Sequence, residues 1–99
     1  MKLIGHFSVD SGQAMVGDPC YIDYWDTNKN EDFDKHPQYA GTYSYLGACN
    51  ATLTKNYGEL GLGTAVVFTT GYGDGLYPVY AKFNDDGRIS KIVIEFDEL

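Results

Sequence analysis

The sequence predicts an all-β, mainly antiparallel protein, folded as a compact β-sandwich or partly open barrel with at most a short helical turn. Apolar and polar residues alternate with a period of two in several segments, and these segments end at Gly, Asp or Pro. No segment keeps the period of 3.6 that an amphipathic helix requires. At 99 residues the chain has the length of one domain, so we expect a single β domain over residues 1–99.

The N-terminal segment predicts two short strands. Residues 3–9 alternate, and Leu3, Phe7 and Val9 fall on the side expected to point inward. A second strand is expected over residues 13–16. It ends at the Gly-Asp-Pro that follows, because proline cannot donate to the hydrogen-bond ladder of a sheet.

The middle of the chain predicts a polar loop and one further strand region. Residues 24–38 are polar and aperiodic, which is typical of a surface loop or a single helical turn. Residues 39–53 place Tyr39, Tyr43 and Tyr45 on one side of an expected strand. Two glycines interrupt this segment and favour a bulge or a bend.

The second half of the chain contains the clearest strand patterns. Residues 63–70 are β-branched and apolar on both sides, which predicts a central strand covered on both faces. Residues 77–83 and 88–97 both alternate and are joined by Asn-Asp-Asp-Gly. In that turn Gly87 suits the left-handed conformation that closes a hairpin loop, so the two runs predict an antiparallel hairpin.

The charge balance and the cysteine usage exclude several classes of function. Seven basic and fourteen acidic side chains give a formal net charge of −7, which disfavours nucleic acid and anionic membrane as partners. No stretch approaches the ~20 apolar residues of a membrane helix, and the start of the chain reaches the polar His6 before any apolar run develops. We therefore expect a cytoplasmic location, with Cys20 and Cys49 as thiols.

The sequence lacks a recognisable catalytic or cofactor-binding set. Zinc ligands normally come in close pairs, and no CxxC or HxxxH spacing occurs. A GxSxG motif and a P-loop are both absent. No cofactor is therefore predicted, and a non-enzymatic role is favoured.

Two stretches carry a resemblance to other proteins. Residues 7–21 read FSVDSGQAMVGDPCY, and residues 70–80 read TGYGDGLYPVY. This combination of a VDSGQ turn, GDPCY and a glycine-rich approach to YPVY resembles small uncharacterised proteins of bacteria and their phages, a domain of unknown function. The resemblance implies a β fold and a prokaryotic or viral origin, and it transfers no catalytic residue.

One hypothesis places a small-ligand or metal-ion site, or an enzyme site, at the loop end of the sheet. Glycines in the turns permit close backbone approach, and neighbouring carboxylates could bind a polar ligand. The candidate residues are Asp10, Ser11, Asp18, Cys20 and Asp74. Turn chemistry alone also accounts for all of these residues.

A weaker hypothesis is a calcium loop. Oxygen-bearing residues alternate in the polar segment as calcium ligands do: Asp26, Asn28, Asn30 and Asp32. However, Glu31 occupies the position where an EF-hand requires glycine, and Pro37 occupies the position of the bidentate glutamate.

The leading hypothesis is a protein-binding module with an aromatic interaction face. Tyrosine is useful at interfaces because it combines a large apolar area with a polar tip. The predicted face comprises Tyr24, Trp25, Tyr43, Tyr45, Tyr72 and Tyr80. Its expected occupant is a protein partner or a second copy of the chain. In a phage setting the partner would be a host protein, and negative charge would speed encounter with a basic surface.

Overall fold

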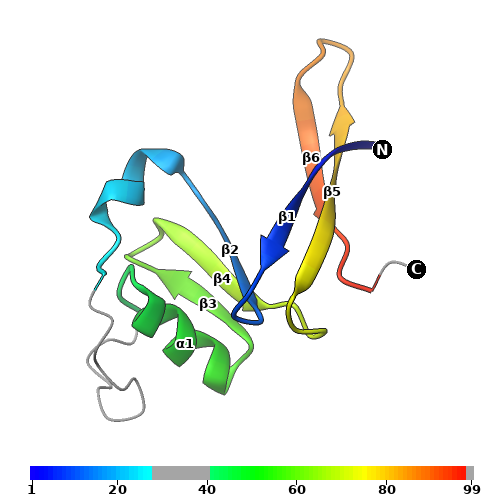
Figure 1. The fold of residues 1–99 in the computed structure, drawn as a ribbon. Helices are drawn as coiled ribbons and strands as arrows, with labels where there is room; N and C mark the ends of the chain where they lie inside the picture. The colour runs from blue at the N-terminus through cyan, green and yellow to red at the C-terminus, as the bar shows by residue number, and fades with distance from the viewer. Residues whose placement is uncertain (28–40, 98–99) are drawn as a thin grey trace. The chain divides into compact units, whose positions relative to one another are not determined.

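The computed structural model describes residues 1–27 and 41–97. The chain forms two compact units (Figure 1). We call the first the terminal unit, since it joins Met1–Gly12 to Thr70–Leu99. The second, Gln13–Thr69, is the central unit. The assignment of residues 1–99 to a single domain stays a prediction.

The terminal unit contains a three-stranded antiparallel sheet with the order β1-β5-β6. Its strands are β1 (Lys2–Val9), β5 (Gly75–Phe83) and β6 (Ile89–Ile94). The predicted hairpin is confirmed, because β5 and β6 pair with each other and Gly87 has a φ of 79°. Tyr77 and Ala81 alternate with more exposed neighbours and are buried.

The inward position predicted for Leu3 is wrong. The pairing of β1 with β5 shifts register between Leu3 and Gly5, so one extra residue enters β1 at that point. Such a bulge reverses the side to which the preceding residues point. Leu3 is therefore 47% exposed, while Val9, beyond the bulge, is buried as predicted.

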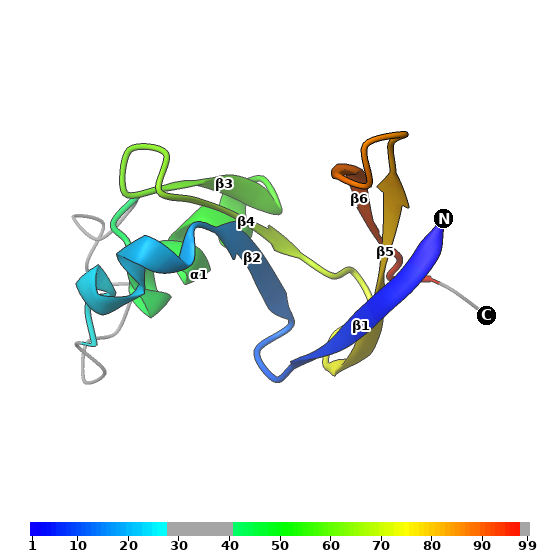
Figure 2. The ribbon, with the colours of Figure 1, turned by 90° about the horizontal axis from the view of Figure 1, so that it is seen from above.

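The central unit contains a second three-stranded antiparallel sheet, with the order β2-β4-β3. Its strands are β2 (Gln13–Gly17), β3 (Tyr57–Leu60) and β4 (Ala65–Thr69). A short 3-10 helix, η1 (Pro19–Tyr24), follows β2, and the helix α1 (Tyr45–Thr54) packs against β3 and β4 (Figure 2). The core of this unit lies between α1 and the sheet and comprises Tyr43, Ala48, Leu60, Ala65 and Val67.

The strand predicted over residues 39–53 is wrong for residues 41–53: residues 41–44 belong to no strand, and α1 begins at Tyr45. Tyr39 lies outside the described residues. Ser44 caps the helix, because its hydroxyl oxygen accepts a hydrogen bond from the Gly47 backbone N–H at 2.9 Å. The buried side chains described in α1 are Leu46, Ala48, Cys49 and Thr52, and all but Leu46 are small. Small residues give a weak apolar signal at a period of 3.6, which is why the sequence pattern missed the helix.

The expectation that β4 is covered on both faces is also wrong. As predicted, β4 is the central strand of its sheet. Val67 faces α1 and is 2% exposed, whereas Val66 is 46% exposed. An apolar run on both sides of a strand therefore does not mean that both sides are packed here.

The all-β fold class is confirmed in its main feature, since the described strands form two antiparallel sheets. Neither sheet closes into a barrel over these residues. The one α-helix of the described part has ten residues, which is longer than the single turn expected. None of the described helices is long and apolar enough to cross a membrane.

Candidate functional site

The side of the β2-β4-β3 sheet that faces away from α1 presents two rows of side chains. The register places Phe68 between Ala14 and Tyr57 in one row. In the second row Val66 lies between Val16 and Glu59. We call these residues the open face: Ala14, Val16, Tyr57, Glu59, Val66 and Phe68.

The residues that alternate with the open-face residues along each strand show which side of the sheet faces α1. Side chains alternate along a strand, so neighbours of the open-face residues must point toward α1. The Gln13 side-chain amide donates to the Cys49 thiol of α1 at 3.2 Å. On β3, a Cβ added at Gly58 would lie 3.1 Å from the Ala51 Cβ of α1. Glycine at this position therefore lets the helix approach the sheet closely.

The open face is largely apolar and accessible. Tyr57 is 62% exposed, Val16 55% and Val66 46%. Ala14 and Phe68 are half-buried. Contiguous apolar patches that stay exposed often mark interaction sites. Directly opposite residues on neighbouring strands also stabilise each other, so these rows support the sheet as well.

Acidic side chains dominate the charges of the central unit. Its described residues include one lysine, Lys55, and four carboxylates, at Asp18, Asp23, Asp26 and Glu59. Glu59 belongs to the open face itself, on the edge strand β3. The open face therefore combines an apolar surface with a negative charge.

The aromatic residues predicted to form an interaction face occupy different settings. Tyr24, at the end of η1, is 75% exposed, and Tyr45, at the start of α1, is 51% exposed. The rings of Trp25 and Tyr43 meet edge to face at 4.9 Å in the core region, and Tyr43 is only 9% exposed.

The remaining two residues of that set, Tyr72 and Tyr80, belong to the terminal unit, where Tyr72 is 66% exposed. The binding role of the six residues stays a prediction. The selected set omitted Tyr57 and Val66. The usefulness of tyrosine at interfaces could have pointed to Tyr57, but only the position of α1 reveals that Val66 is accessible.

The residues predicted for a ligand site at the loop end are divided between the two units. Asp10 and Ser11 follow β1 and Asp74 precedes β5, and the pairing of Val9 with Gly75 brings these turns side by side in the terminal unit. Asp18 and Cys20 belong to the central unit. There the Asp18 carboxylate accepts a hydrogen bond from the Cys20 backbone N–H at 2.9 Å and caps η1. A shared site for all five residues stays a prediction.

Three of the four residues predicted for a calcium site lie outside the described residues: Asn28, Asn30 and Asp32. Asp26 is described, and its backbone N–H donates to the Tyr43 carbonyl at 3.0 Å. Across residues 1–27 and 41–97, no three His, Cys, Asp or Glu side chains gather closely enough to hold a metal ion.

The two cysteines are free, as expected for thiols. Cys20 is exposed and Cys49 is 6% exposed. A hydrogen bond between the side chains of Tyr45 and Cys49 raises the pKa of Tyr45, and the charge interaction with Cys49 and partial burial raise it further. The contact with Tyr45 lies within α1, whereas the hydrogen bond from Gln13 joins the helix to β2. Together these contacts give Cys49 a structural role.

The fold and the open face define a small, acidic, mainly antiparallel β protein with an accessible apolar sheet surface. The chain belongs to the DUF4241 family, whose description is a protein of unknown function, and the family model matches residues 4–94. Comparisons with curated proteins and with solved structures gave no match.

Proposed function

We propose that this protein is a non-enzymatic protein-binding module whose contact surface is the open face. The observation that carries the proposal is the exposure of Tyr57, Val16 and Val66 on a sheet whose other side holds the core of the central unit. Burying such side chains in a complex gains roughly 25 cal/mol for each Å² of apolar surface removed from water. Tyrosine is also one of the residue types that most often dominate the binding energy of an interface.

The partner is a different protein that presents an apolar patch bordered by Lys or Arg. Glu59 places a carboxylate within the open face, and the whole chain carries a net charge of −7. A second copy would bring equal negative charge to the same interface, which disfavours association. A basic partner would instead be attracted, and the rate of encounter would fall as salt is added.

The cytoplasm is the compartment in which we place this interaction. Cys20 is exposed and unpaired, and such a thiol persists most readily in a reducing environment. The protein would act there as a bacterial or phage product, and in a phage setting its partner would be a protein of the host.

Affinity capture followed by measurement with the purified partner tests this proposal. The full chain is immobilised and exposed to a lysate of the organism that carries its gene, and the captured protein is purified for calorimetry. The proposal requires a basic partner that binds the free, monomeric chain and whose affinity falls with added salt. Truncating a hot-spot tyrosine costs about 2 kcal/mol of binding free energy, so Tyr57→Ser is expected to weaken binding about thirtyfold.

Tyr72→Ser is the matched control, because Tyr72 is 66% exposed and Tyr57 is 62% exposed, but Tyr72 lies in the terminal unit. This variant is expected to change the affinity by less than about twofold. Val66→Glu, which adds charge in the middle of the open face, is expected to abolish capture. Three results would contradict the proposal: capture that survives Val66→Glu, equal losses for the two tyrosine variants, or dimerisation of the chain through the open face.

A further inference from the structure

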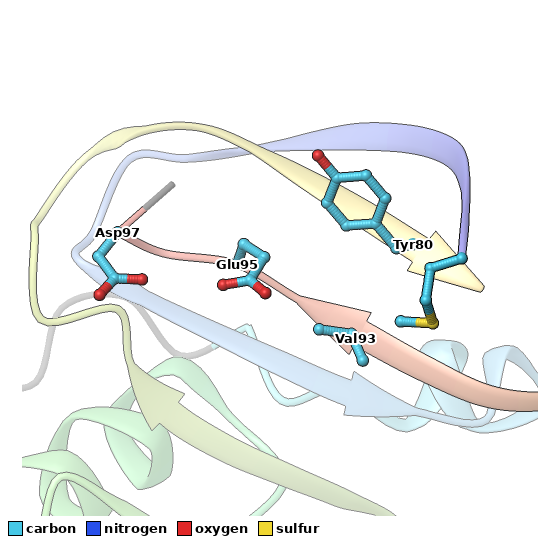
Figure 3. A pocket seen from close by; sticks show the side chains of 5 residues that line it. Tyr80, Val93, Glu95 and Asp97 are labelled. Carbon is cyan, nitrogen blue, oxygen red and sulfur yellow. The ribbon is translucent and has the colours of Figure 1, made fainter. Parts of the chain in front are cut away.

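The terminal unit contains a hollow of about 460 Å³ on one side of its sheet. Its lining combines an aromatic ring, a thioether, an aliphatic side chain and two carboxylates, contributed by Met1, Tyr80, Val93, Glu95 and Asp97. Figure 3 shows Val93, Glu95 and Asp97 in a row along β6 and its continuation, with the Tyr80 ring beside them on β5. A volume of this size is in the range of small-molecule and side-chain binding sites.

The alternation of the sheet explains why these residues converge. Tyr80 and Val93 are directly opposite each other in the β5–β6 register, so they project to the same side. The Glu95 backbone N–H lies 3.5 Å from the Pro78 carbonyl oxygen, which keeps the chain beside β5 after β6 ends. Phe96 packs edge to face on Tyr77, with ring centroids 5.3 Å apart, on the other side of the sheet. Its two neighbours, Glu95 and Asp97, therefore turn toward the hollow.

The lining matches one class of ligand, a planar organic cation. A carboxylate pair supplies acceptors for several N–H donors, and a tyrosine ring attracts a cation placed over its face. A guanidinium group satisfies both conditions, since it donates in a planar fork and stacks on aromatic rings. The thioether of Met1 and the side chain of Val93 provide apolar contact for an attached alkyl chain.

We propose that this hollow binds a guanidinium group, such as that of an arginine side chain. The site lies in the terminal unit and goes beyond the protein-binding role of the open face, which involves other residues. The next pair along the sheet, Lys82 and Lys91, projects on the same side as Tyr80 and Val93. These lysines and the α-ammonium group of Met1, which lines the hollow, repel a cation, so the guanidinium is held by the carboxylates of Glu95 and Asp97.

Nuclear magnetic resonance titration of the full-length protein tests this site. The probe is N-acetylarginine amide, and its matched control is N-acetylcitrulline amide, which has the same shape without the charge. We expect the arginine probe to shift the amide signals of Tyr80, Val93 and Glu95 with a dissociation constant in the millimolar range, and the citrulline probe to bind at least tenfold more weakly. Free arginine is tested in parallel. Tighter binding of free arginine than of N-acetylarginine amide would indicate a small-molecule ligand, and the reverse would indicate the side chain of a peptide.

Charge variants decide whether the two carboxylates are responsible. The double variant Glu95→Gln with Asp97→Asn is expected to weaken the binding of the arginine probe at least tenfold. Asp85→Asn, which removes an exposed carboxylate from the turn between β5 and β6 in the same unit, leaves binding unchanged. Lys82→Gln is expected to tighten binding about twofold, because it removes a neighbouring positive charge. Unchanged amide spectra away from the hollow would establish that each variant is folded. Equal binding of the arginine and citrulline probes, or undiminished binding by the folded double variant, would overturn the proposal.

Discussion

Replacing the adjacent valines of β4 with threonine provides a stringent comparison of the two faces of the central sheet. Val67 is 2% exposed and packs in the core with Tyr43 and Leu60, whereas Val66 is 46% exposed on the open face. Threonine has nearly the shape of valine and retains the β-branch, so strand propensity changes little. The two variants therefore differ mainly in whether the new hydroxyl is buried.

The burial of the two positions sets the expected magnitudes. Val67→Thr loses about 0.8 kcal/mol of apolar transfer energy for the missing methyl group. It also buries a hydroxyl, which costs about 1–3 kcal/mol when no partner is well placed. We expect the free energy of unfolding to fall by about 2–3 kcal/mol. In Val66→Thr the hydroxyl can reach water, and the change should stay within about 0.5 kcal/mol.

Urea unfolding followed by tryptophan fluorescence measures the difference in stability between the two variants, and it does so in the central unit. Trp25 is the single tryptophan, and its ring lies 4.9 Å from that of Tyr43, so its emission reports on the central unit. With a urea dependence of about 1–1.5 kcal/mol per molar for a small protein, the midpoint of Val67→Thr should fall by about 2 M. Equal losses of stability in the two variants, or a larger loss for Val66→Thr, would refute the assignment of faces.

Three further predictions concern α1 and the cysteines. Gly47→Ala would drive a Cβ into the Thr42 carbonyl oxygen just before the helix and should lower the free energy of unfolding by about 1–3 kcal/mol. At Gly5 an added Cβ meets no atom within 4 Å, so Gly5→Ala should change it by less than about 0.5 kcal/mol. Thermal unfolding followed by circular dichroism compares the two variants. The raised pKa of Tyr45 means that its contact with Cys49 stabilises the fold below pH 10 and that this contribution is lost as the pH rises through the elevated pKa. Cys49→Ala should accordingly lower the pKa of Tyr45 toward 10.0 in a titration of its ring resonances, and an unchanged pKa would show that the contact is absent. Finally, Cys20 should react with a thiol reagent in the folded protein and Cys49 only on unfolding, as mass spectrometry of the labelled peptides can determine.

The parts of the fold that depend on neighbouring residues could be predicted from the sequence. The β5–β6 hairpin is local, because two alternating strands meet at a turn in which Gly87 adopts the left-handed conformation. The end of β2 is likewise local, since Asp18 and the proline after it begin η1. In these segments turn chemistry and alternation agree with each other.

The parts that depend on distant contacts could not be predicted. The small residues of α1, such as Ala48 and Thr52, carry little apolar signal, and the nearby tyrosines resemble a strand pattern. The bulge that exposes Leu3 depends on how β1 pairs with a strand more than seventy residues away in the chain. Register of this kind is set by tertiary packing and leaves a weak trace in the sequence.

The candidate site was only partly accessible to sequence reasoning for the same reason. The predicted aromatic face included side chains in contact with solvent, since Tyr24 and Tyr45 are exposed. The sequence could not separate them from Tyr43, which the core holds. Val66 looked like a core residue because its neighbours are apolar. Only the location of α1 on one side of β4 determines which valine faces the core.

Paramagnetic broadening of methyl signals by a soluble gadolinium chelate tests most directly whether the open face is available for binding. In the free protein, the methyl groups of Val16 and Val66 should broaden strongly, while those of Leu60 and Val67 should remain sharp. Protection of Val66 equal to that of Val67 in the free protein would contradict the central claim, because it would mean that the proposed contact surface is already covered.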